Sequence, residues 1–160
     1  MTYKAIRLLI LIPMAIVAWL PFEVKADKNV DMLREFLWNN RLLLVFAPRS
    51  SDNNFLQQRK MVKSNEAGFI DRDMVVIEIV GGRVFAREYP LKFRYLASSY
   101  RANFGVSERE FRTFLVGKDG HIKYKSSLAS DPCHLFDLID SMPMRRREIT
   151  KDSGINTCIN

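Results

Sequence analysis

Cys133 and Cys158 are the only thiols in this chain of 160 residues and its most reactive side chains. Cys133 follows Pro132 at the start of a predicted helix, where amide dipoles favour a thiolate, and His134 lies beside it. One hypothesis is a thiol-dependent oxidoreductase or peroxidase-like enzyme, with Cys133 as nucleophile and Cys158 as resolving thiol. Neighbouring helical residues point about 100° apart, however, so His134 need not reach the thiol. Two further hypotheses stay open, a structural disulfide stabilising the fold by about 3 kcal/mol and a pair of unpaired thiols.

A second candidate site is Arg49-Ser50-Ser51, between a predicted strand and a predicted helix. Free amide groups at a helix N-terminus attract anions, and a guanidinium and two hydroxyls would assist them. The pattern therefore favours a small anionic ligand at this loop. The alternative is that Asp52 caps the helix and the serines form local turns.

Two charged clusters are further candidate sites, and the first, Asp71-Arg72-Asp73, could serve in ligand binding or in acid-base chemistry. Arg72, within Asp71-Arg72-Asp73, precedes a predicted strand, where charges also commonly form surface ion pairs. Arg145 begins a run of three arginines expected just after the last helix, where positive charge stabilises exposed carbonyls. With Lys118, Lys123 and Lys125, this run could instead form a basic face for an acidic partner.

Metal and cofactor motifs do not emerge from the sequence. His121, His134 and the two cysteines lack the close spacing of metal ligands. We find no phosphate-binding loop, nucleophile elbow or paired-carboxylate motif. The sequence therefore predicts neither a metal site nor a cofactor.

The N-terminal residues 1–26 have the pattern of a secretory signal peptide. Lys4 and Arg7 precede an apolar run over 8–20, and Ala26 offers a small-residue cleavage site. The run is shorter than the roughly 20 residues that a membrane-spanning helix needs, although a retained anchor is the alternative. We expect a secreted or periplasmic domain over 27–149, a flexible tail over 150–160 and no integral membrane span after cleavage.

The charge of the chain is positive, at +7. Removal of the signal peptide would leave about +5, which favours anionic surfaces in general terms. Export argues against a nucleic-acid partner. We therefore expect the partner to be an unidentified protein or an anionic ligand of the envelope or the extracellular space.

The candidate residues are held by elements that the sequence pattern predicts. A helix is expected over 31–40, followed by a buried strand over 41–47 that Pro48 ends. A helix then begins at Asp52 and fades near Gly68, and a second buried strand covers 74–80. A strand, a helix and a strand in this order form a parallel crossover unit, which indicates an α/β fold.

The second half of the chain predicts antiparallel structure. A helix is expected over 91–103, and strands over 111–116 and 121–125 are joined by a turn that contains Asp119-Gly120. A closing helix begins near Asp131 and ends at Pro143. The predicted domain thus has a central mixed sheet of about four strands flanked by helices.

This order of elements resembles the thioredoxin fold. More narrowly, the chain resembles a family of unknown function found as small secreted bacterial proteins and at the C-terminus of sushi-repeat extracellular proteins. The resemblance covers about residues 29–149. It is carried by Arg41-Leu42-Leu43-Leu44-Val45-Phe46-Ala47-Pro48, Asp71-Arg72-Asp73, Gly117-Lys118-Asp119-Gly120 and Ile139-Asp140-Ser141-Met142-Pro143-Met144-Arg145. It implies a secreted thioredoxin-like domain, with no established activity.

The chain departs from thioredoxins at the redox loop. Ser50 and Asn53 stand where the resemblance places the two cysteines, and residues 107–113 lack the proline that precedes the third strand. A serine hydroxyl ionises too weakly to attack a disulfide at neutral pH, so thiol exchange is not expected there. The sequence therefore favours a redox-inactive binding or interaction module, and an enzyme that uses Cys133 is the alternative.

Overall fold

The computed structural model describes residues 33–86 and 96–149 together with Cys158. The predicted signal peptide over 1–26 lies outside the described residues, as does the predicted tail except for Cys158. Within the described part, no helix has the length and apolar character required to cross a membrane.

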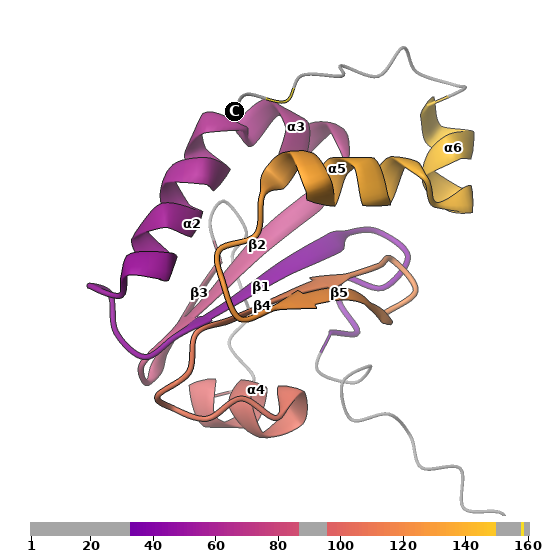
Figure 1. Ribbon diagram of the computed structural model, residues 1–160. Helices are drawn as coiled ribbons and strands as arrows, with labels where there is room; N and C mark the ends of the chain where they lie inside the picture. Colours follow the sequence, from indigo (N-terminus) through magenta and orange to yellow (C-terminus); the bar gives the residue numbers. More distant parts are fainter. Residues whose placement is uncertain (1–32, 87–95, 150–157, 159–160) are drawn as a thin grey trace, which may run out of the picture.

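A five-stranded mixed sheet forms the centre of the fold (Figure 1). Its strands, β1 (Arg41–Ala47), β2 (Met74–Val80), β3 (Arg83–Ala86), β4 (Arg112–Val116) and β5 (Ile122–Ser126), lie in the order β3-β2-β1-β4-β5. β1 and β2 are parallel, and the other neighbouring pairs are antiparallel. The α/β class is confirmed, and the four predicted strands have the order and directions of a thioredoxin-like sheet.

The fifth strand, β3, corrects the expected number of about four. It spans four residues at the sheet edge, and it pairs Val80 with Arg83 across the turn made by Gly81-Gly82. Gly81 and Gly82 do follow the end of β2, as the sequence predicts, but they also form the turn of a tight hairpin that leads into β3. Such a short edge strand carries too little alternation to be recognised from its sequence.

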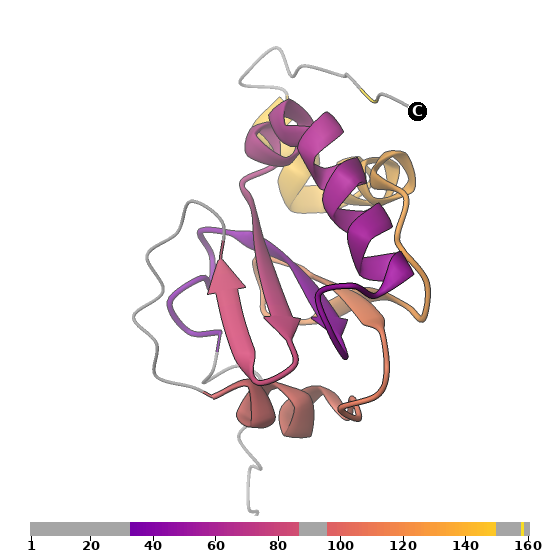
Figure 2. The same ribbon diagram turned by 90° about the vertical axis from the view of Figure 1, so that its left-hand side faces the viewer.

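Side chains of β1 alternate between two hydrophobic clusters, one on each face of the sheet. Leu43, Val45 and Ala47 pack beneath α2 (Asn53–Ser64), α3 (Glu66–Asp71) and α5 (Pro132–Asp140). The even-numbered residues of β1 pack on the opposite face with α4 (Ala97–Phe104). Figures 1 and 2 show these helices on the two sides of the sheet. Burial on both faces accounts for the continuous apolar sequence of this strand.

Four predicted boundaries are wrong. Of the helix expected over 91–103, residues 91–95 lie outside the described residues, and α4 begins only at Ala97, after Leu96. Residues 33–39 form turns, such as the one closed by the Phe36 amide and the Leu33 carbonyl, in place of the expected helix. The helix expected to run to Gly68 is two helices, interrupted at Asn65, whose side-chain amide donates to the Met61 carbonyl at 3.0 Å. Pro143 begins α6 (Pro143–Ile149) instead of ending the last helix.

Candidate functional site

The β1–α2 loop lies beside the β2–β3 hairpin at the carboxyl ends of the two parallel strands. The Gly81 amide donates to the Ala47 carbonyl at 3.0 Å and ties the two connections together. Asp52 caps α2, because its Oδ1 accepts the Phe55 amide at 3.0 Å. The capping interpretation is therefore confirmed, and the Asp52 carboxylate satisfies one of the free amides of the helix N-terminus.

A pocket of about 300 Å³ opens between this loop and this hairpin. Its lining residues are Arg49, Ser50, Val80, Gly81, Gly82, Arg83 and Phe85. Arg83 and Phe85 are two positions apart on β3 and so point to the same face of the sheet. The lining residues include two arginines and no acidic residue, which makes the pocket electropositive.

The two arginines of the pocket form no ion pair within the part of the chain that the structure describes. Within residues 33–86 and 96–149, neither the Arg49 nor the Arg83 guanidinium forms a hydrogen bond or an ion pair with another residue. Both residues are exposed, so solvent satisfies their donors. These cations are therefore available to a ligand without the loss of an existing contact.

Arg101 adds a third, buried cation near the ends of the same strands. It is 4% exposed, and its Nη2 donates to the Ala47 carbonyl at 2.7 Å. Its Nη1 donates to the Ser107 carbonyl at 2.7 Å, while its Nε has no partner. Desolvation lowers the pKa of the Arg101 guanidinium, and the charge of Glu108 opposes that shift. Arginine stays protonated at neutral pH, so this end of the sheet carries a buried positive charge.

The other predicted site residues lie at the opposite end of β1 in a network of ion pairs. The network connects four cations and four carboxylates, namely Arg41, Arg72, Lys118, Arg145, Asp71, Asp73, Asp140 and Glu148. All four motifs that carry the family resemblance thus contribute to this network, whose two halves are joined by the Arg145–Glu148 pair at 3.7 Å. Because the charges balance, the network is electrically neutral as a whole.

Glu148 is the link between α6 and the sheet. Its carboxylate accepts Arg41 Nη1 at 3.1 Å and Lys118 Nζ at 2.9 Å. Burial alone would raise the pKa of Glu148, but the hydrogen bonds and charges of Lys118 and Arg41 outweigh it and hold the pKa below its usual range. Glu148 is therefore ionised at neutral pH and stabilises the docked position of α6.

Arg145 lies within α6, so the expectation that the arginine run follows the end of the last helix is wrong. Its guanidinium bonds Asp140 Oδ1 at 3.1 Å and contacts both the carbonyl and the carboxylate of Asp71. Arg72 and Lys118 are likewise paired with carboxylates. These contacts favour the structural interpretation of the three residues over a basic face.

A smaller cavity of about 140 Å³ adjoins this network. It is lined by Arg41, Gly117, Lys118, Asp119, Lys123, Met142, Pro143 and Met144. Its three cations already bond carboxylates, since Lys123 pairs with Asp119 at 2.6 Å and the other two bond Glu148. The charge available to a ligand is therefore smaller here than in the pocket beside Arg49.

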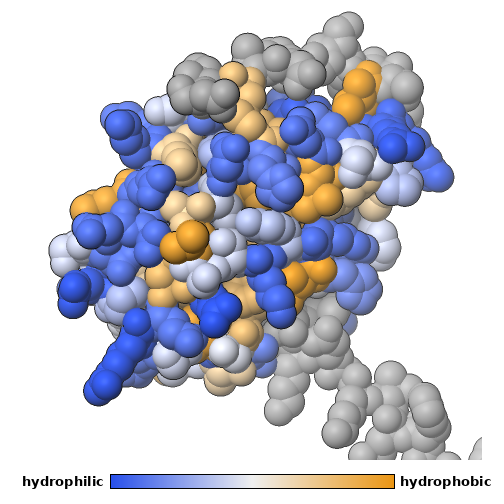
Figure 3. Space-filling view, viewed as in Figure 1, coloured by the Kyte–Doolittle hydropathy of each residue, from blue (hydrophilic) through white to orange (hydrophobic). Residues whose placement is uncertain are grey.

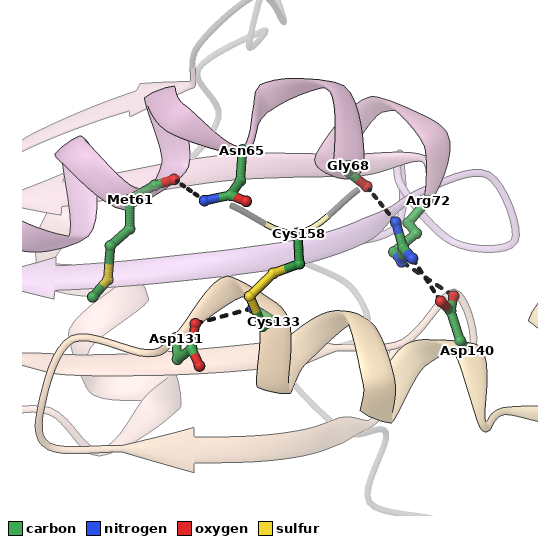
Figure 4. The surroundings of a disulfide bond; sticks show 8 residues. All are labelled: Met61, Asn65, Gly68, Arg72, Asp131, Cys133, Asp140 and Cys158. Atoms are coloured by element: carbon green, nitrogen blue, oxygen red, sulfur yellow. Dashed lines mark hydrogen bonds and ion pairs between the residues drawn. A yellow bond between two sulfur atoms is a disulfide. The ribbon is translucent and has the colours of Figure 1, made fainter. Parts of the chain in front are cut away.

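The two cysteines form a disulfide, and the prediction of their pairing is confirmed. Figure 4 shows the bond joining Cys133, at the start of α5, to Cys158. The Cys133 amide donates to Asp131 Oδ1 at 3.1 Å, which caps α5. The His134 ring packs against Tyr124 with 5.2 Å between ring centroids. The bond joins Cys158, close to the chain end, to the body of the domain.

Sequence reasoning missed several residues of both ends of the sheet. Arg83 and Phe85 were overlooked because β3 was not predicted. Arg41 and Glu148 were overlooked although a charge at the start of an otherwise apolar strand indicates a buried ion pair. Arg101 had no such indication, because arginine is ordinary in a helix.

The surface seen in Figure 3 is mainly hydrophilic, with separate hydrophobic areas. Phe85 is one of the large hydrophobic residues that are exposed in the described part of the chain, at 46%. Single exposed apolar residues are common on soluble domains and by themselves indicate no interface. The electropositive pocket is therefore the more informative surface feature.

Sequence similarity to known proteins extends over most of this chain. It is 29% identical over 144 residues to Coiled-coil domain-containing protein 80 of Danio rerio, which matches 79% of this chain and 16% of that protein. It is 29% identical over 134 residues to Sushi repeat-containing protein SRPX of Homo sapiens, across 79% of this chain and 28% of that protein. It is 28% identical to Sushi repeat-containing protein SRPX2 of Xenopus laevis, across 85% of this chain and 31% of that protein.

The chain thus spans less than a third of the length of these relatives. A family model described as "Domain of unknown function (DUF4174)" matches residues 32–148, which include the strands and helices described above except for Ile149, the last residue of α6. The resemblance expected from the four sequence motifs is therefore confirmed, and the chain belongs to this family of domains of unknown function.

Proposed function

We propose that this protein is a secreted binding module that recognises a ligand at the pocket beside Arg49 and carries out no thiol exchange there. One observation carries the proposal. At the loop where the resemblance places redox cysteines, the chain has Arg49, Ser50 and Ser51, and an electropositive pocket occupies this position. Oxyanion recognition requires only positioned cations, whereas disulfide exchange requires a thiolate.

The proposed localisation is the periplasm or the extracellular space. The N-terminal pattern over 1–26 supports export, and a disulfide persists in oxidising compartments. We accordingly propose that a binding domain over 27–149 follows the cleaved signal peptide and that residues 150–160 form a flexible tail. The partner is an unidentified protein or an anionic ligand of that compartment.

The second candidate function is a thiol oxidoreductase that uses the Cys133–Cys158 disulfide. It is favoured by the position of Cys133 in the first turn of α5, where a released thiolate would be stabilised. A catalytic disulfide must be reduced and re-formed in each cycle, so this function predicts turnover that depends on both cysteines.

Two assays separate the functions. In insulin-disulfide reduction and hydroperoxide turnover, we expect the native protein and Cys133→Ser to be equally inactive. Titration of thiols should detect none in the native protein and two after reduction and unfolding. Activity that Cys133→Ser abolishes would refute the binding-module proposal.

The positive test is capture from the envelope or extracellular fraction. The immobilised native domain is compared with the Arg49→Ala/Arg83→Ala double variant and with Arg146→Ala/Arg109→Ala, which removes two exposed cations outside the pocket. We expect a ligand that the native domain and the control retain and the pocket variant loses. Equal retention by all three would show that the pocket is not the recognition site.

A further inference from the structure

The arrangement of the two arginines at the pocket beside Arg49 indicates which class of ligand the pocket can bind. Arg49 comes from the loop after β1, and Arg83 comes from the first position of β3, so two separate elements each contribute an arginine to the lining of one space. A guanidinium has a planar fork of donors that matches the oxygens of carboxylate, sulfate or phosphate. Two such forks on different elements suit one oxyanion group held between them.

The position of the pocket agrees with ligand binding. It lies beyond the carboxyl ends of the parallel strands β1 and β2, the end at which open α/β sheets commonly bind ligands. The hydrogen bond from the Gly81 amide to the Ala47 carbonyl joins the two connections that form the walls. Their relative position is thus set before a ligand arrives, which lowers the entropic cost of binding.

Acidic residues near the pocket are engaged elsewhere. Glu78 lies opposite Phe85 in the β2–β3 register, but its carboxylate accepts Arg59 Nε at 3.0 Å. The Asp52 carboxylate caps α2. Neither residue lines the pocket, so neither competes directly with an incoming anion for Arg49 or Arg83.

The size and the apolar lining of the pocket indicate the rest of the ligand. A water occupies about 30 Å³ in the liquid, so about 300 Å³ holds far more than a single oxyanion group. Val80 and Phe85 line the same space, and 46% of Phe85 is exposed. An exposed aromatic ring beside two cations suits a flat apolar group attached to the anion.

We propose that this pocket binds an organic oxyanion, with a phosphate, sulfate or carboxylate group between Arg49 and Arg83 and a flat apolar group against Phe85. The inference rests on the proposed function and names the chemistry of its ligand. It assigns direct roles to Arg83 and Phe85, two residues of a strand that the sequence pattern did not reveal.

The test is titration of the full mature chain, followed by nuclear magnetic resonance, with phenyl phosphate, phenyl sulfate, benzoate and inorganic phosphate as probes. We expect at least one phenyl anion to bind about tenfold more tightly than inorganic phosphate. The three phenyl probes also reveal which oxyanion group the arginines prefer. Amide shifts should be concentrated at Ser50, Gly81 and Gly82, which line the pocket.

Variants test which residues bind the anionic group of the ligand and which bind its phenyl group. Arg49→Ala and Arg83→Ala should each weaken the preferred phenyl anion about tenfold, whereas the exposed-cation control Arg146→Ala should not change its affinity. Phe85→Ala should reduce the affinity for the phenyl anion to that for inorganic phosphate. A Phe85→Leu variant, which keeps apolar bulk but lacks the ring, should be intermediate.

Three results would overturn the inference. They are the absence of binding by all the phenyl probes, shifts located outside the pocket, and an equal loss in Arg146→Ala. If the probes fail but capture from the envelope fraction still depends on Arg49 and Arg83, only the ligand chemistry is wrong. If thiol-dependent turnover is found instead, the proposed function itself is wrong.

Discussion

Arg72 and Asp140 form a two-pronged ion pair that joins the end of α3 to the end of α5. Arg72 Nε lies 3.1 Å from Asp140 Oδ1, and Arg72 Nη2 lies 2.5 Å from Oδ2. The same guanidinium lies 4.3 Å from the centre of the Phe136 ring. The Arg72 side chain is only 2% exposed, so loss of Asp140 would leave this buried cation with a single, longer carboxylate contact, to Asp71 Oδ2 at 3.4 Å.

The first prediction concerns Asp140→Asn, which removes this charge without a change of shape. Because Arg72 and Arg145 both bond Asp140, we expect the free energy of unfolding to fall by about 3 kcal/mol. Urea unfolding followed by circular dichroism measures this loss. The control is Glu110→Gln, since Glu110 and Arg112 are partly exposed and 3.8 Å apart, and its expected loss is below about 0.5 kcal/mol. Equal losses in the two variants would contradict the structural role of the network.

The second prediction concerns acid. The pKa of Glu148 is lowered in the folded state from an ordinary value of 4.5, so the unfolded chain binds more protons as the pH falls below that value. The stabilisation by Glu148 is therefore present above 4.5 and is lost as the pH falls through the lower folded value. In urea unfolding between about pH 5 and pH 2, Glu148→Gln should show a shallower loss of stability than the native protein. An unchanged pH slope would show that Glu148 does not contribute.

The third prediction tests the contact between α3 and α5. A Cβ atom at Gly68 would lie 2.4 Å from an edge atom of the Phe136 ring, so Gly68→Ala forces the two helices apart. We expect a loss of about 1–3 kcal/mol in the free energy of unfolding. Gly82→Ala is the matched control, because a Cβ atom there would meet nothing within 4 Å, and its unfolding midpoint should change little. A Gly68→Ala variant as stable as Gly82→Ala would contradict the described packing.

The fourth prediction concerns the disulfide. Reduction of the native protein should lower the free energy of unfolding by about 3 kcal/mol, because the bond closes a loop with a sequence separation of 25. Cys133→Ser should show the same loss without reductant and no further change with it. Thermal unfolding with and without a phosphine reductant measures both effects. A reductant effect that persists in Cys133→Ser would have to come from another source.

Local sequence pattern predicted much of the fold. Buried strands over 41–47 and 74–80 were found because both faces of each strand pack against helices, which demands a continuous apolar run. The hairpin was found because Asp119-Gly120 favours a tight turn, and Gly120 has a φ of 78°. The sequence pattern did not predict the break between α2 and α3 at Asn65 or the start of α6 at Pro143. Long-range packing decides where these helices begin and end, and the local pattern does not contain it.

Some features of the candidate site also follow from local sequence, whereas others depend on the fold. The sequence by itself determined that the loop after Pro48, where the thioredoxin resemblance places cysteines, lacks thiols, that Asp52 can cap a helix and that Cys133 and Cys158 are the only cysteines in this sequence. Each of these facts depends on residue type or on neighbours within one turn. Such information is complete before the chain folds.

Only the tertiary structure decided which cations are neutralised and which face an open pocket. Arg41 and Glu148 are 107 residues apart in the sequence but form an ion pair. Arg49 and Arg83 line one pocket only because β3 folds back beside β2. A charged residue has the same identity whether it faces a carboxylate, a backbone carbonyl or solvent. Its role is therefore set by the long-range contacts of the fold, to which sequence periodicity is insensitive.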